Sequence, residues 1–259
     1  MSKQHESPSP RSRAAPLERQ VEPSEPNAGV ARGWLALGLR AHASVAAFAR
    51  FSLQLLQLGA PAELVAAAAT AMQDEIQHAR ACFELARRHS SDDAGPGRLA
   101  LDGALEQIDP ATVVLDTIRE GCVGQTLAAL EAAEALQHCE EPAARAVLAR
   151  IAREGGHHAE LAWRFVAWAI ETRPELGEPV RAAFARELAG ARRGRGIWTM
   201  SAADRELARH GLLSAAMRAA LRERVLAGVV APCAKALLAG AGWKRPDAGF
   251  GTNDAAHPA

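Results

Sequence analysis

Apolar residues recur with a helical period in four long stretches of this 259-residue chain, and each stretch is bounded by proline or glycine. The first predicted helix runs from about Val30 to Leu58 and stops at Gly59. The second begins after Pro61 and ends near His89. Proline near the first helical position and glycine just past the last one are frequent boundary residues, so these limits favour two separate helices.

The third predicted helix opens at Asp109-Pro110, an acidic N-cap followed by proline, and continues to about His138. The fourth starts near Pro142 and ends near Arg173-Pro174. Short connections, LGAP and CEEP, join the helices within each pair, whereas the connection between the pairs is longer. Two helical hairpins with a longer crossover are one known way to wire a four-helix bundle.

We therefore predict an all-α protein with a helical bundle over residues 29–173 and accessory helices packed on it over residues 174–243. Residues 1–28 and 244–259 are predicted to be disordered tails. The N-terminal tail is rich in proline, serine and charge, and such a composition cannot bury enough apolar surface to fold.

Composition excludes several classes of partner and location. The formal net charge is zero, so nothing indicates nucleic acid or a membrane surface as a partner. No apolar run reaches the ~18 residues of a membrane span. The four cysteines form no C-x-x-C pair, which favours reduced thiols in a cytoplasmic protein. The partners remain unknown, and a homodimer stays open.

Two polar residues interrupt the apolar stripe of the second helix. Glu75 and His78 are three residues apart and share one helical face with alanines and leucines. A buried carboxylate is costly unless it is paired or bound to a metal. The alternative is a surface pair that is aligned by chance, because E-x-x-H is a common pattern.

In the fourth helix, IAREGGHHAELAWRF carries Gly155-Gly156 ahead of His157-His158. His158 interrupts an apolar stripe and is the inward candidate, although a core histidine satisfied by a hydrogen bond is the commoner case. Glu154 and His157 lie about 100° from that stripe. In the third helix, the stripe argument places Gln125 inward, and Glu120 lies on a more mixed row.

These residues resemble a bacterial branch of the ferritin-like, di-iron carboxylate superfamily. The matching stretches are HASVAAFARFSLQLLQLGAPAELV, DEIQHARACFELA, EGCVGQTLAALEAAEAL and HHAELAWRFVAWAI, between about Trp34 and Ile170. The resemblance implies a ferritin-like four-helix bundle with one Glu from each of two helices and a Glu-x-x-His from each of the other two. In such proteins six ligands hold two irons, which activate dioxygen or are oxidised by it.

Carried onto this sequence, the resemblance implies metal ligands at Glu75, His78 and His158, together with Glu120 or the position of Gln125. Two expected carboxylates are absent. In the first helix, the resemblance implies the sequence EHASV, whereas this chain reads AHASV, so Ala41 stands in place of a glutamate. In the fourth helix, the resemblance implies a glutamate three residues before His158, and this chain has Gly155 there.

The missing acids limit the metal content. Two ferrous ions bring four positive charges, which about four carboxylates balance in this superfamily. We therefore expect at most one Fe or Zn ion, because two His and one Glu suit either metal, rather than a full di-iron centre. Binding of no metal, or a small cavity where the acids are lost, fits the sequence equally well.

Two functions fit these observations. The first is a non-catalytic ferritin-like bundle with a depleted site and a binding or scaffold role. The second is an active di-iron oxidase or oxygenase with non-standard ligands: Glu154 and His157, rotated inward by a π-bulge at the glycine pair, and His42. The sequence reveals no substrate and no redox partner.

Overall fold

The computed structural model describes residues 28–90, 95–103, 109–189 and 199–240, and within these ranges the fold is all-helical, without β-strands. The predicted all-α class is confirmed. The predicted disordered tails lie outside the described residues, apart from Ala28, which is the first residue of the first helix.

The first two helices form a long antiparallel hairpin, α1 (Ala28–Leu58) and α2 (Ala62–Arg88). Gly59 adopts a φ of 68° between them, a conformation that costs glycine less than any other residue. The expected limits are confirmed to within a few residues.

The second hairpin contains α3 (Pro110–Asp116), a π-helical segment η1 (Thr117–Gln125), α4 (Thr126–His138) and α5 (Pro142–Thr172). The Asp109 carboxylate accepts hydrogen bonds from the backbone amides of Ala111 and Thr112. This N-cap was expected. The sequence did not reveal that the predicted third helix would contain a π-helical segment.

The π-helical segment η1 packs closely against α5. A Cβ atom added to Gly121 would stand 2.5 Å from the Cβ of Ala162, so only glycine permits this approach of the two helices. Because a π-helix has more residues per turn than an α-helix, the inward face of this segment differs from the one that a 3.6-residue period predicts.

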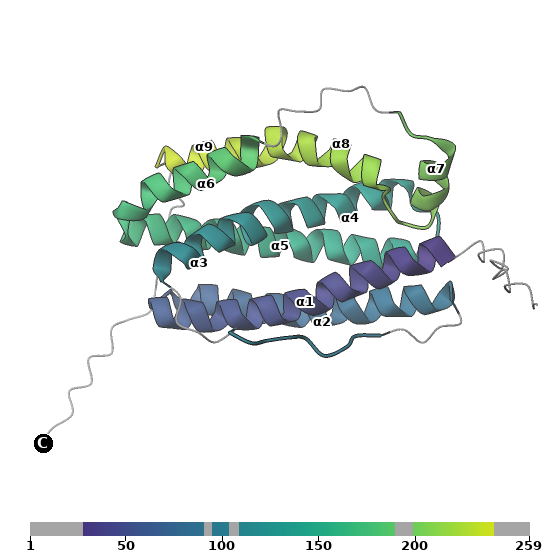
Figure 1. Ribbon diagram of the computed structural model, residues 1–259, viewed down its shortest axis with the longest axis horizontal. Helices are drawn as coiled ribbons and strands as arrows, with labels where there is room; N and C mark the ends of the chain where they lie inside the picture. The colour runs from purple at the N-terminus through teal and green to yellow at the C-terminus, as the bar shows by residue number, and fades with distance from the viewer. Residues whose placement is uncertain (1–27, 91–94, 104–108, 190–198, 241–259) are drawn as a thin grey trace, which may run out of the picture.

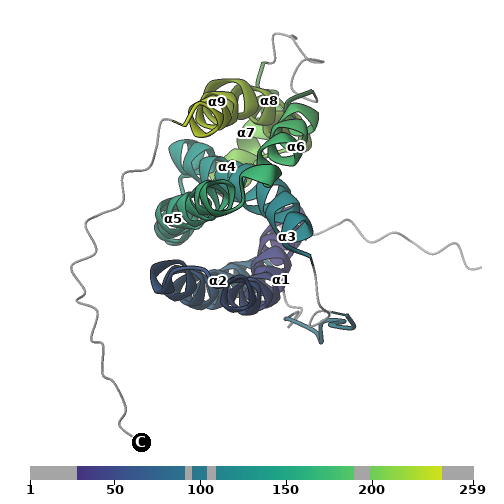
Figure 2. The same ribbon diagram turned by 90° about the vertical axis from the view of Figure 1, so that its left-hand side faces the viewer.

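The helices lie in three layers (Figures 1 and 2). The hairpin of α1 and α2 forms one outer layer, and α3, α4 and α5 form the middle layer. The two hairpins pack against each other mainly through α2 and α5. Large core side chains such as Trp34, Leu55 and Phe165 are fully buried between them.

The third layer holds the predicted accessory helices. They are α6 (Gly177–Ala189), which follows a 3-10 turn η2 (Pro174–Leu176), then α7 (Ala202–Arg209), α8 (Ala215–Val225), a π-helical segment η4 (Leu226–Val230) and α9 (Ala231–Leu238). Ser201 and Asp204 form a capping box at the start of α7. The chain stays helical through Pro232, which lies in the first turn of α9, directly after the π-helical segment η4.

No helix among the described residues is both long and apolar enough to cross a membrane.

Candidate functional site

Three predicted ligands meet between the two hairpins. Glu75 and His78 come from α2 and His158 comes from α5, and their exposed fractions are only 7%, 3% and 2%. The rings of His78 and His158 are 6.0 Å apart between centroids. The prediction that these three residues face inward is confirmed, whereas His157 is exposed.

The Glu75 carboxylate lies between the two histidines. Its Oε1 is 3.4 Å from Nδ1 of His158, and its Oε2 is 3.6 Å from Nδ1 of His78. These distances are long for hydrogen bonds, and Nδ1 of His158 is a buried atom without a hydrogen-bond partner among the described residues. Each Nδ1 atom therefore faces the same carboxylate, that of Glu75.

The opposite nitrogen of each ring is held by a second carboxylate. Nε2 of His78 is 2.8 Å from Oε2 of Glu154, and Nε2 of His158 is 3.1 Å from Oδ2 of Asp74. Histidines that bind metals almost always donate their other ring N–H to a carboxylate, carbonyl or water. The residue types and the outer carboxylates are thus those of metal ligands, but the donor atoms of Glu75, His78 and His158 do not all lie within 4.8 Å of one another, so the side chains would have to move closer to share one ion.

Burial and charge act in opposite directions on this cluster. Burial raises the pKa of Glu75, but the adjacent imidazoles of His158 and His78 outweigh it, so that this pKa lies below its ordinary value. Burial lowers the pKa of His78, but the carboxylates of Glu75 and Glu154 outweigh it, and this pKa is raised. Without metal, Glu75 is therefore held ionised and His78 favours its protonated form.

The positions that lack the expected acids border an open cavity of about 930 Å³. Ala41 and Gly155 both line it, as do Gln125, Glu75 and His78. A Cβ atom on Gly155 would stand 3.2 Å from the Cβ of Ala129, so the backbones of α5 and α4 approach closely here. The sequence led us to expect a small cavity at the lost acids, and the cavity found there is instead large and open.

Glu120, the other predicted ligand, lies outside this cluster. Its side chain is half-exposed, and its Oε1 is 2.9 Å from Nη2 of Arg119. Its Oε2 is 3.8 Å from Arg50. Glu120 shares the border of a smaller cavity, of about 70 Å³, with His158 and Gln125, but it is not among the carboxylates that contact the histidines.

Sequence reasoning missed Asp74 and placed Glu154 on a different face. Both acids flank the inward face and reach it with their side chains, so the helical period alone does not find them. The signal for Asp74 was its place directly before Glu75 in the run Asp-Glu-x-x-His. The α-helix α5 is regular through Gly155 and Gly156, and Glu154 reaches His78 without the π-bulge that was considered there.

The fold and the cluster together define an all-helical protein with buried carboxylates and histidines between two hairpins. Comparisons with protein-family models, curated proteins and solved structures found no match for this chain.

Proposed function

We propose that this chain is a ferritin-like four-helix bundle with a depleted di-metal site, and that it acts as a binding protein rather than as an oxidase. Two observations support the ferritin-like arrangement. The short-looped hairpins α1–α2 and α3–α5 pack through α2 and α5, and Glu75, His78 and His158 meet between them.

One observation carries the proposal of depletion. Ala41 and Gly155 border the cavity beside Glu75 and His78, so two expected carboxylates are replaced by side chains that cannot bind a metal. In the part of the chain that the structure describes, Glu75 is the carboxylate that faces both Nδ1 atoms. With neutral imidazoles, the single carboxylate leaves a net charge of +1 on one divalent ion and of +3 on two, so this ligand set suits one ion rather than two.

The cavity supports the binding role. Alanine, leucine, isoleucine and glycine side chains make up much of its wall, and such a surface suits a small apolar ligand. Replacing Ala128, which lines the cavity on α4, by phenylalanine should reduce binding of ANS, an anionic dye that binds to apolar surface, at least about fivefold. Ala149→Phe, on an exposed face of α5, should leave dye binding unchanged.

The second candidate, a di-iron oxidase, is favoured by the contact between Glu154 and His78. Glu154, however, faces Nε2, whereas Glu75 faces Nδ1 of the same ring. The two carboxylates therefore lie on different sides of the imidazole. We infer that Glu154 orients His78 and does not join Glu75 at the same metal.

The deciding experiment compares the metal content of the wild-type protein with that of a His78→Asn, His158→Asn double variant after anaerobic ferrous loading. The depleted site predicts a difference of at most one iron per chain and no dioxygen consumption above that of the variant. A difference close to two irons, with dioxygen consumption that the variant lacks, would establish the oxidase instead. Because only the difference is used, iron bound elsewhere does not affect the result.

A further inference from the structure

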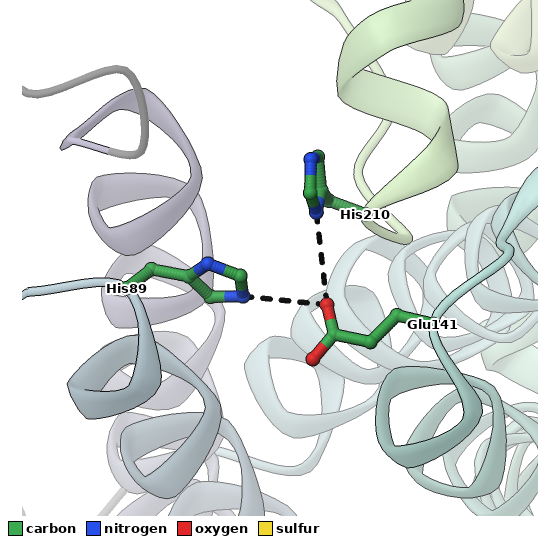
Figure 3. Close-up of side chains that lie close together, drawn as sticks. All are labelled: His89, Glu141 and His210. Carbon is green, nitrogen blue, oxygen red and sulfur yellow. Dashed lines mark ion pairs between the residues drawn. The ribbon is translucent and has the colours of Figure 1, made fainter.

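A second group of metal-binding side chains lies where three helices end (Figure 3). His89 follows the last residue of α2, Glu141 precedes α5, and His210 follows α7. Along α2, His89 is eleven residues from His78, or about 16 Å at the rise of an α-helix. This group is therefore separate from the buried cluster around Glu75.

The distances in this group match those of a metal site. Oε2 of Glu141 is 3.3 Å from Nε2 of His89 and 3.7 Å from Nδ1 of His210, and Figure 3 shows both contacts meeting at that one oxygen. Tetrahedral ligands at the Zn²⁺ bond lengths of ~2.0–2.2 Å stand about 3.3–3.5 Å apart. Among the described residues, this is a group of three His or Glu side chains that could share one ion, because one donor atom from each residue lies within 4.8 Å of the others.

Two donor atoms of the group lack hydrogen bonds. Nε2 of His89 and Oε2 of Glu141 are buried, and neither has a hydrogen-bond partner in the part of the chain that the structure describes. A buried polar atom without a partner costs about 1–3 kcal/mol, so native proteins rarely leave one unsatisfied. Glu141 also makes no side-chain cap on α5, although it occupies the N-cap position. An ion between these atoms would satisfy both.

Contacts around the group hold its three parts in place. The indole Nε1–H of Trp34 donates to the carbonyl of His210 at 3.1 Å. The amide of Glu140 donates to the carbonyl of Arg209 at 2.8 Å, and their side chains form an ion pair at 2.9 Å. The corner that carries His210 is thereby fixed beside the loop that carries Glu141.

The His210 ring also has an outer carboxylate, as metal-binding histidines usually do. Its Nε2 lies 3.6 Å from Oε1 of Glu206, one turn earlier on α7. An outer carboxylate of this kind orients a coordinating imidazole and raises its basicity. Nδ1 of His210 is then left to face Glu141.

We propose that His89, Glu141 and His210 form a divalent-metal site, with Zn²⁺ as the best-fitting ion, that fastens α7 to the ends of α2 and α5. Two imidazoles and one carboxylate are a frequent zinc ligand set, and they leave a fourth position for water. The side chains of Glu141 and His210 are about one-quarter exposed, so solvent reaches the edge of the group, although Oε2 of Glu141 itself is buried. The proposal does not depend on the function of the buried cluster.

The test uses the full chain, stripped of metal with a chelator and titrated with Zn²⁺, and with Co²⁺ for its visible spectrum. Glu141→Gln and His210→Asn should each remove one zinc equivalent or weaken its binding at least about tenfold. His138→Asn is the matched control, because His138 lies near the same end of the bundle and pairs with Glu134 outside the group. His138→Asn should still bind this zinc equivalent, and so should the His78→Asn, His158→Asn double variant.

Tetrahedral Co²⁺ absorption that disappears in Glu141→Gln would support the site. The proposal is overturned if the wild-type protein binds zinc no better than Glu141→Gln does, because the three side chains then contact one another without serving as metal ligands. Glu141→Gln is nearly isosteric, and melting of the metal-free proteins shows whether it is folded. It therefore decides the question even if His210→Asn fails to fold.

Discussion

The carboxylate of Glu154 lies 2.8 Å from Nε2 of His78, while Glu75 faces Nδ1 of the same ring. One imidazole on α2 thus has an acid of its own helix on one side and an acid of α5 on the other. This contact links the two hairpins at the buried cluster.

Replacing either acid by its amide should lower the pKa of His78 in the metal-free protein. Glu75→Gln and Glu154→Gln should each have this effect, because both carboxylates raise the pKa of His78. Titration of the His78 ring resonances by NMR measures both changes. Glu160→Gln, at an exposed position of α5, is the control and should leave the titration unchanged. An unchanged pKa in Glu154→Gln would show that the contact is not maintained in solution.

The stability of the metal-free protein should be greatest at mildly acidic pH. The pKa of Glu75 is lower in the folded protein than its ordinary value of 4.5. The ionised carboxylate therefore stabilises the fold above pH 4.5, and this contribution to stability is lost as the pH falls through the pKa of the folded protein. The raised pKa of His78 gives a contribution that is present below 6.5 and lost as pH rises through the folded value. Both contributions to the free energy of unfolding are therefore complete between about pH 4.5 and pH 6.5.

Chemical denaturation across this pH range, with chelator present, measures the effect. In Glu75→Gln both contributions should diminish, since the variant removes one titrating group and a partner of the other. A wild-type profile that matches the profile of this variant would contradict the electrostatic account of the cluster.

The helices could be predicted from the sequence because their boundary residues act locally. Asp109, Gly59 and Pro142 each specify a helix end through a cap, a left-handed residue or a fixed φ, and the structure places the ends there. The inward placement of Glu75, His78 and His158 followed from a regular 3.6-residue period, which α2 and α5 keep.

The remainder of the site depends on contacts that no local pattern contains. The π-helical segment changes the face that Glu120 and Gln125 present, and it is coupled to the approach of Gly121 to Ala162 on a distant helix. Asp74 and Glu154 reach the histidines from neighbouring faces with flexible side chains. His89 and His210 are 121 positions apart and meet only because α7 packs at the end of the bundle.

The two adjacent glycines of α5 should respond differently to alanine. Gly156 is exposed, and a Cβ added there would meet no atom of another helix within 4 Å. Gly156→Ala should therefore stabilise the protein by about 0.4–1 kcal/mol, because alanine reduces the conformational entropy of the unfolded chain. At Gly155 the added Cβ would stand 3.2 Å from the Cβ of Ala129, which offsets part or all of that gain. Gly121→Ala, with a 2.5 Å approach to Ala162, should destabilise by about 1–3 kcal/mol.

Thermal or urea denaturation of the three single variants tests this order. Gly156→Ala melting below the wild-type protein would mean that the backbone of α5 at the glycine pair is not a regular helix in solution. Gly121→Ala as stable as the wild-type protein would mean that η1 and α5 do not approach as closely as the structure shows.

Restoring the two missing carboxylates should restore metal binding. In an Ala41→Glu, Gly155→Glu double variant, the two new carboxylates would join Glu75 and His78 on the wall of the cavity. Without metal this variant should be less stable than the wild-type protein, because each buried carboxylate that lacks a partner costs at least about 1–3 kcal/mol. Ala41 is buried against Ala79 and Phe83 but borders the open cavity, so water there relieves part of that cost.

With ferrous ion or Zn²⁺ present, the double variant should bind at least one more metal per chain than the wild-type protein and regain the lost stability. Stabilisation by a bound ion reaches about 2.7 kcal/mol when its concentration is 100 times the dissociation constant, which a melting curve resolves. Ala149→Glu, on an exposed face of α5, is the control for added charge. A double variant that folds but binds no additional metal would show that the cavity is not a depleted metal site, because the ligands would be present and the ion would still be absent.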